Sequence, residues 1–256
     1  MGLSPSTAIF LFFAGLVGGT MNGIAGGGTF VVFPALLFAG VPPVPANATN
    51  SVALWPGLAA STRAFWPRLA TPRRLLISMV ITGLLGGVAG AVLLIRTPAR
   101  IFTLIMPWLM LTATVVFALG GLVGRRVESR GGLDASIGKI AAAIFFEFVL
   151  AIYGGYFGGG IGILLLALFG TLGMNDIHQM NALKIVLVTI INGVAVVTFV
   201  IARAVYWPQT LVIVAAAVAG GHFGARLSQR LPAALVRAFV LLVGTGATIY
   251  FFVRAS

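Results

Sequence analysis

The sequence predicts an all-α integral membrane protein built from two inverted-topology repeats. Each repeat is expected to contain a glycine-broken helical hairpin followed by three transmembrane helices. Three observations predict this class. Of the 256 residues, 60% are hydrophobic and only 8% are charged, which leaves no solvated surface for a water-soluble domain. The apolar residues form long segments separated by short polar loops, and the clusters Gly26-Gly27-Gly28 and Gly158-Gly159-Gly160 interrupt two of the apolar stretches.

The lengths of the apolar segments determine which of them can cross a bilayer. In chain order the segments are 5–24, 29–41, 47–66, 74–95, 99–123, 137–157, 161–174, 178–202, 208–227 and 233–253. A helix rises about 1.5 Å per residue and the hydrocarbon core is about 30 Å thick, so segments of about twenty residues span it. The two segments after the glycine clusters are shorter, and we interpret them as half-membrane arms of hairpins. The arms before the clusters either span the bilayer or turn back within it.

The distribution of basic residues predicts the orientation. One set of loops and helix ends receives eleven of them, Arg63, Arg68, Arg73, Arg74, Arg125, Arg126, Arg130, Lys139, Arg226, Arg230 and Arg237. The opposite set receives four, Arg96, Arg100, Arg203 and Arg254. Cytoplasmic loops of membrane proteins are enriched in Lys and Arg, so the first set is placed in the cytoplasm. Both termini are then expected outside the cytoplasm, across the inner (cytoplasmic) membrane.

The order of the segments repeats along the chain. We expect a first membrane repeat over residues 1–123, a cytoplasmic linker over 124–136 and a second membrane repeat over 137–256, all within a single membrane domain. Each repeat holds five apolar segments, and this odd number starts the second repeat on the opposite side of the membrane. Inverted repeats of this kind are common in secondary transporters.

The glycines allow two interpretations. Small residues four positions apart, such as Gly15 with Gly19 and Gly83 with Gly87, favour close packing between membrane helices. The triple glycines go further, because each glycine weakens a helix by up to about 1 kcal/mol and opens backbone conformations that other residues avoid. Unpaired backbone groups are tolerated at membrane depth only where they are buried in protein or line a cavity. Matching breaks in two inverted halves therefore indicate a substrate site, and the amides that begin the following half-helices suit an anion.

Polar residues open the helix that follows each hairpin. They are Asn47, Thr49, Asn50 and Ser51 in the first half, and Gln179, Asn181 and Lys184 in the second. Helix capping explains one residue per helix but not a cluster. Lys184 lies inside an apolar segment, where a lysine either contacts substrate, snorkels to the interface or forms a structural ion pair. The predicted substrate-binding residues are Gly26, Gly27, Gly28, Thr49, Asn50, Ser51, Gly158, Gly159, Gly160, Asn181 and Lys184.

The acidic residue Glu147 lies in the middle of an apolar segment. A buried carboxyl group is a candidate proton carrier for coupling, and the alternative is a structural pair with Lys184 or Arg203. The chain has no cysteine, and its two histidines and four acidic residues show no metal-ligand spacing, so no metal and no cofactor is expected. No basic stretch carries stacking aromatics, which argues against nucleic acid as a partner. No catalytic arrangement is present either, so we expect the protein not to be an enzyme.

Two long stretches carry a family resemblance. "GGTMNGIAGGGTFVVFPALLFAGVPPVPANATNS" begins at Gly18 and "GGYFGGGIGILLLALFGTLGMNDIHQMNALK" begins at Gly154. The paired glycine hairpins, Pro34 and the Ala48-Thr49-Asn50-Ser51 motif resemble the TauE/SafE sulfite exporter family over nearly the whole chain. The resemblance implies two homologous halves that move sulfite, sulfoacetate or related organosulfonates, coupled to protons or another ion. The second half departs from the pattern, because Asn181-Ala182-Leu183 stands where a Thr-Asn pair is expected.

Together these observations predict a secondary transporter for a small sulfur-containing anion. Its expected partners are that anion and the lipid bilayer, and the sequence leaves the oligomeric state open. The absence of a nucleotide-binding motif argues against ATP as the energy source. An anion channel or facilitator for another small carboxylate or inorganic anion is the alternative that the same features allow.

Overall fold

The computed structural model describes residues 3–25, 27–127, 137–174, 176–227 and 233–255. Within these ranges the chain is helical and has no strand. Its elements are α1 (Pro5–Ala25), α2 (Thr29–Phe38), α3 (Pro43–Phe65), the 3-10 helix η1 (Trp66–Arg68), α4 (Arg73–Arg96), α5 (Ala99–Val127), α6 (Ile137–Tyr156), α7 (Ile161–Thr171), α8 (Ile177–Ile201), α9 (Trp207–Leu227) and α10 (Ala233–Ala255). The predicted all-α class is confirmed for the described chain.

Most helix boundaries lie close to the predicted segments, but α3 begins earlier than predicted. It starts at Pro43, with Pro42 as its N-cap residue, rather than at residue 47. Proline is well tolerated in the first turn of a helix because the amide it lacks would have no partner there. Asn47 and Asn50 therefore lie inside α3 and do not cap it. In α8, by contrast, the Asp176 carboxylate does cap the helix and accepts hydrogen bonds from the amides of His178 and Gln179.

The two helices that follow the glycine clusters are short. α2 has 10 residues and α7 has 11, so neither is long enough to cross a membrane. Five described stretches are long and apolar enough to do so, namely Pro5–Asn22, Arg73–Arg96, Ala99–Leu119, Gly138–Tyr156 and Ile177–Ile201. The predicted crossings by α3, α9 and α10 are not among them. In α3 the prolines and asparagines lower the hydropathy, and the search covered only the described parts of α9 and α10.

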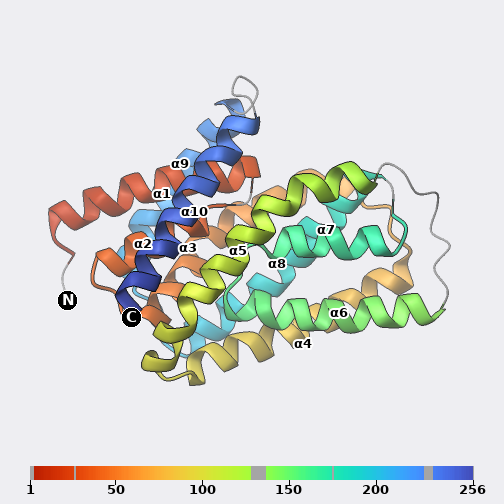
Figure 1. Ribbon diagram of the computed structural model, residues 1–256, viewed down its shortest axis with the longest axis horizontal. Helices are drawn as coiled ribbons and strands as arrows, with labels where there is room; N and C mark the ends of the chain where they lie inside the picture. Colours follow the sequence, from red (N-terminus) through yellow and green to blue (C-terminus); the bar gives the residue numbers. More distant parts are fainter. Residues whose placement is uncertain (1–2, 26, 128–136, 175, 228–232, 256) are drawn as a thin grey trace.

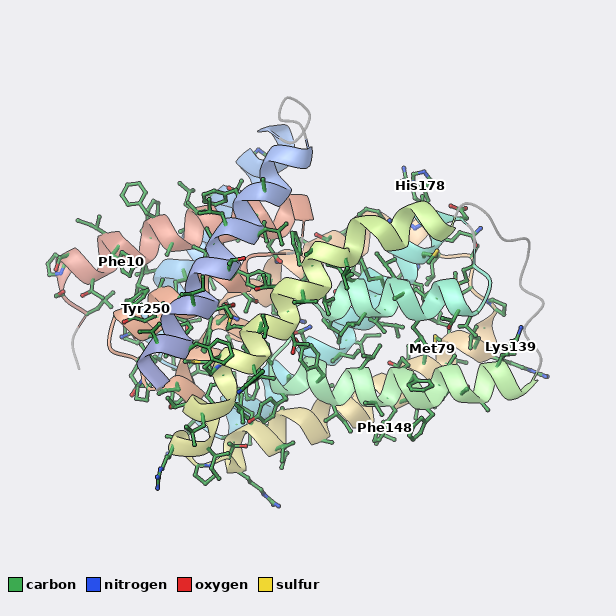
Figure 2. All side chains as sticks on the ribbon, viewed as in Figure 1. Phe10, Met79, Lys139, Phe148, His178 and Tyr250 are labelled. Carbon is green, nitrogen blue, oxygen red and sulfur yellow. The ribbon has the colours of Figure 1, made fainter. Side chains whose placement is uncertain are left out.

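The outer faces of the bundle are rich in large apolar side chains. Phe13, Leu85, Phe145 and Leu242 are 59%, 61%, 62% and 73% exposed, and Phe10 projects away from the bundle (Figure 2). In water this much exposed apolar area would cause aggregation, whereas in a bilayer it faces lipid. The exposed faces of the helices therefore agree with a membrane-embedded protein.

Two pairs of helices pack closely through small residues. α1 lies against α9, and α4 lies against α6 (Figure 1). A Cβ added at Gly15 would lie 3.0 Å from the Ala216 Cβ, and one added at Gly86 would lie 2.6 Å from the Ala151 Cβ. The predicted use of small residues in helix packing is confirmed at these two interfaces.

The arrangement places α3 and α8 side by side at the centre, with the short helices α2 and α7 beside them. α5 and α10 cross the outside of this centre (Figure 1). α1 begins and α10 ends on the same side of the molecule, at the left of Figure 1, whereas α5 ends and α6 begins at the right. Residues 128–136, which make up most of the predicted linker, lie outside the described chain.

Candidate functional site

A cavity of about 530 Å³ lies between the two halves of the chain. Its walls include Thr29 at the start of α2, the face of α3 that carries Asn50, and the start of α7. α8 completes the walls with Asn181, Lys184 and Asn192. A volume of about 300–1,000 Å³ is typical of sites for small molecules. Both predicted hairpins and both polar helix starts thus meet at one cavity.

The second glycine cluster has the backbone conformation of a helix break. Gly158 and Gly160 have φ angles of +79° and +78°, in the left-handed region that favours glycine. α7 begins directly after Gly160, and the residues of its first turn, Ile161 to Ile163, line the cavity. The first amides of a helix have no acceptor within that helix, so the amino end of α7 presents free donors and a partial positive charge to the cavity.

The first glycine cluster uses glycine for a different reason. Gly28 has a right-handed φ of −58° and acts as the N-cap residue of α2. A Cβ added there would lie 2.6 Å from the Gly18 carbonyl oxygen and 3.1 Å from the Asn22 Cβ. Glycine is therefore needed at this position because α1 passes very close to the start of α2. Gly26 lies outside the described residues.

Lys184 brings a positive charge into the cavity. It is partly buried, and its Nζ donates a hydrogen bond to the Asn181 Oδ1 at 2.7 Å. The side chain of Lys184 lies along the start of α7: a Cβ added at Gly162 would lie 3.3 Å from the Lys184 Cδ. None of the described lining residues is acidic. Among the described residues, the lysine therefore has a neutral partner and no carboxylate beside it in the cavity.

Asn50 and Ser51 line the cavity from the first half. The Asn50 Nδ2 donates to the Thr29 hydroxyl at 3.3 Å, while its Oδ1 is buried without a hydrogen-bond partner. The oxygen and nitrogen of an amide are assigned from the network, and a reversed Asn50 would accept from Thr29 and leave its amide nitrogen free. In either orientation one polar atom of Asn50 has no hydrogen-bond partner, although only 1% of the residue is exposed.

Four described residues of the predicted site lie outside the cavity wall, namely Gly28, whose close contact with α1 is given above, Thr49, Gly159 and Gly27. Thr49 points away from it and accepts a hydrogen bond from the Tyr206 amide at 3.0 Å. The Gly159 carbonyl accepts a hydrogen bond from the Tyr153 hydroxyl at 2.6 Å. A Cβ added at Gly27 would lie 2.8 Å from Val240 of α10, so this glycine packs against another helix. None of these four residues is among those that line the cavity.

Glu147 also lies apart from the cavity. It is fully buried between α6, α4 and α8, where its Oε2 accepts a hydrogen bond from the Thr82 hydroxyl and its Oε1 has no partner. A Cβ added at Gly83 would lie 3.2 Å from the Oε1 and 3.3 Å from Ile191 of α8. The structure shows no pair with Lys184, which bonds to Asn181, and Arg203 is exposed in the loop that follows α8. The alternative of a structural ion pair is therefore absent from the described residues.

Sequence reasoning missed several residues of the cavity wall. They are chiefly Asn22, Thr29, Asn192, Phe157, Arg68 and His178. A signal existed for Asn192, because it follows Lys184 by eight residues and so lies about two turns further along the same face of α8. Arg68 and His178 are exposed and mark the end at which the cavity reaches the surface; His178 projects from the start of α8 (Figure 2).

The opposite end of the cavity is closed. Phe157 lines the cavity and packs edge-on against Phe33, with ring centroids 5.8 Å apart, and Phe33 contacts Phe102 in turn. The buried Asn47 Nδ2 donates to the Tyr156 carbonyl at 2.8 Å and joins the start of α3 to the end of α6. The cavity is thus open at one end of the bundle and closed at the other by packed aromatic side chains.

Comparison with known proteins identifies the family. Residues 11–251 match the family described as sulfite exporter TauE/SafE. The chain belongs to the TauE/SafE family. It is 26% identical over 244 residues to a "Probable membrane transporter protein" of Haemophilus influenzae, covering 95% of this chain and 93% of that protein. A match of 25% identity over 240 residues joins it to the "Probable membrane transporter protein ORF9" of Sinorhizobium sp., covering 94% and 90% of the two chains.

A third relative is the "Probable membrane transporter protein YfcA" of Escherichia coli K12, with 26% identity over 244 residues and coverage of 94% and 88%. No solved structure matches the chain. The protein is a multi-pass membrane transporter of the TauE/SafE family, which confirms the resemblance carried by the glycine hairpins. Within the described residues no group of three or more potential metal ligands is present.

Proposed function

We propose that this TauE/SafE protein transports small sulfur-containing anions, such as sulfite, sulfoacetate or related organosulfonates, across the cytoplasmic membrane. The observation that carries the proposal is Lys184, a partly buried cation whose partner is the neutral side chain of Asn181. A cation at membrane depth is costly unless it is paired or serves a function. An anion in the cavity would provide the missing charge partner. It would also accept hydrogen bonds from the amino end of α7.

The proposed mechanism is alternating access by two inverted repeats. Helix packing supports this mechanism. In helix order, α1 to α5 of the first half correspond to α6 to α10 of the second. The contact of α1 with α9 then has its counterpart in the contact of α6 with α4. α2 also contacts α10, and α7 contacts α5, in the same correspondence. Rocking of the two halves around the cavity would expose the anion to each side of the membrane in turn.

The proposed orientation places both termini outside the cytoplasm of the inner membrane. The end of the cavity marked by Arg68 and His178 then opens to the cytoplasm, and the layer formed by Phe157, Phe33 and Phe102 closes the extracytoplasmic side. In this proposal the described structure is the state that faces the cytoplasm. A cationic mouth would attract anions from that side.

Coupling to protons is proposed to use Glu147. Its carboxyl group is buried, its Oε1 has no hydrogen-bond partner, and its surroundings include α8, the helix that also carries Lys184. A proton on Glu147 would remove a buried charge beside a helix that also contacts the substrate. An anion channel remains the competing function, and it would require a path through the aromatic layer that is open at rest.

The test is flux into proteoliposomes. Sulfite and sulfoacetate are supplied outside vesicles that contain wild-type protein, Lys184→Ala or Lys139→Ala, the last being an exposed control lysine at the start of α6. Loss of a charge-assisted contact is expected to raise the KM for flux about 10- to 100-fold in Lys184→Ala, and Lys139→Ala is expected to keep the wild-type KM. Flux equal to that of empty vesicles for every anion would overturn the proposal. A gradient-independent, non-saturating flux would indicate a channel.

A further inference from the structure

A second concave site lies on the outside of the bundle. It has a volume of about 480 Å³ and is lined by the end of α4, the start of α5 and the end of α6. Its walls carry Leu93, Ile101, Ile105, Val149 and Ile152. We call it the outer groove. Leu93, Ile101 and Val149 are 53%, 50% and 45% exposed, so the groove opens outward and does not join the substrate cavity.

The polar atoms of the outer groove are already used. Its remaining wall residues are Thr97, Tyr153 and Tyr156. The Tyr156 hydroxyl donates to the Thr97 Oγ1 at 3.3 Å, and the Tyr153 hydroxyl donates to the Gly159 carbonyl at 2.6 Å. A ligand in the groove would therefore meet an apolar floor without free hydrogen-bonding groups. This surface suits a hydrocarbon chain.

The position of the groove determines which hydrocarbon is available. Leu93, Ile105 and Val149 belong to the membrane-spanning stretches Arg73–Arg96, Ala99–Leu119 and Gly138–Tyr156, so the groove faces the acyl chains of the bilayer. Two exposed arginines flank the end of the groove. Arg96 directly precedes the wall residue Thr97, and Arg100 directly precedes the wall residue Ile101.

No acidic residue among those described neutralises Arg96 and Arg100. Glu147 is buried against Thr82, and Asp176 caps α8. We propose that the outer groove binds an anionic phospholipid, with an acyl chain on its apolar floor and the headgroup phosphate at Arg96 and Arg100.

Tyr153 connects this site to the transport machinery. Tyr153 is a wall residue of the groove, and its hydroxyl donates a hydrogen bond to the Gly159 carbonyl within the glycine break. The neighbouring residues Gly158 and Gly160 line the substrate cavity. A lipid packed against the Tyr153 ring would therefore limit the motion of the hairpin that contains the anion site. The occupancy of the groove is expected to strengthen anion binding.

Native mass spectrometry of the purified protein with phosphatidylglycerol tests the lipid site. Val149→Trp and Ile101→Trp fill the groove from its two walls, and each should reduce lipid retention at least tenfold. The matched controls are Val115→Trp and Leu104→Trp on α5, which alter equally exposed lipid-facing positions (45% and 53%) outside the groove. Equal retention by groove and control variants that fold like the wild type overturns the proposal. So does a lipid-free wild-type dimer that becomes a monomer in the groove variants, which would identify a second copy of the chain as the occupant.

The headgroup contact is tested by lipid choice. Wild-type protein is expected to prefer phosphatidylglycerol over phosphatidylcholine of the same chains by about thirtyfold, since each arginine contributes roughly a fivefold gain. Arg96→Gln with Arg100→Gln should abolish this preference. Arg73→Gln with Arg74→Gln, at the other end of α4, should retain it. A preference that survives the first double variant overturns the assignment of the headgroup site.

The link to the hairpin is tested with Tyr153→Phe, which keeps the ring in the groove and removes the hydrogen bond to Gly159. Added phosphatidylglycerol should tighten sulfoacetate binding in the wild type but not in this variant. An equal effect in both proteins would overturn the link. The lipid measurements contain no transported anion, so their failure is distinguishable from failure of the proposed transport function. Only this last experiment rests on that function.

Discussion

Substitution of Gly160 separates the two physical reasons for glycine at the hairpin breaks. Gly160 has a φ of +78°, and the nearest heavy atoms to an added Cβ would be 3.5 Å away, at ordinary contact distance. Gly160→Ala therefore introduces conformational strain without a clash. The left-handed region costs an L-residue about 1–2 kcal/mol, and the reduced freedom of the unfolded chain offsets about 0.5 kcal/mol. The expected loss in free energy of unfolding is about 0.5–1.5 kcal/mol.

Reversible unfolding in mixed micelles, followed by tryptophan fluorescence, measures this loss. Gly160→Asn should lose less, because asparagine tolerates the left-handed region better than alanine. Gly57→Ala is the matched control in α3, since its Cβ would meet open space and its φ is not positive. That control should gain about 0.5–1 kcal/mol through better helix propensity. If Gly160→Ala were as stable as the wild type while Gly57→Ala behaved as expected, the strain argument would be wrong.

Three further perturbations test other parts of the structure. Gly86→Val should destabilise the protein by about 1–3 kcal/mol through overpacking of α4 against α6, in the same unfolding assay; unchanged stability would contradict the close packing. Trp55→Phe should lower the free energy of unfolding by about 1 kcal/mol, because the indole nitrogen donates a hydrogen bond to the Thr189 carbonyl at 3.0 Å. Unchanged stability of this variant would show that the hydrogen bond contributes nothing. Glu147→Gln should keep sulfoacetate binding and lose accumulation driven by a pH gradient, and accumulation equal to that of the wild type would remove Glu147 from coupling.

Much of the helical framework followed from hydropathy alone. α4 was predicted at 74–95 and is found at Arg73–Arg96, because charged arginines delimit an uninterrupted apolar run. The start of α3 was misplaced because Pro42, Pro43 and Pro45 suggest a loop, although proline fits the first helical turn. Local composition thus predicts where apolar helices lie, but it does not distinguish a proline-rich loop from a proline-rich helix start.

The site was predicted at the level of its elements more than of its side chains. Asn50, Asn181 and Lys184 line the cavity as expected, whereas Thr49 does not. Residues two positions apart on a helix point about 160° apart, so Thr49 cannot face the cavity together with Ser51, and this constraint follows once α3 is assigned as a helix there. The place of Arg68 and His178 in the cavity wall depends on how α3 and α8 pack together, and the periodicity of the sequence does not predict this packing.

The single lysine in the interior of the cavity has an electrical consequence. The first half contributes only neutral side chains to the cavity interior, and Lys184 of the second half contributes one positive charge. With a monovalent anion bound, the proposed site is neutral, so membrane voltage acts mainly on the return of the empty transporter. One charge crossing the full potential corresponds to about 2.3 kcal/mol per 100 mV, and a shorter path through the field to proportionally less. A cytoplasm that is electrically negative would therefore hold the empty site towards the cytoplasm, the side to which the cavity opens in the proposed orientation.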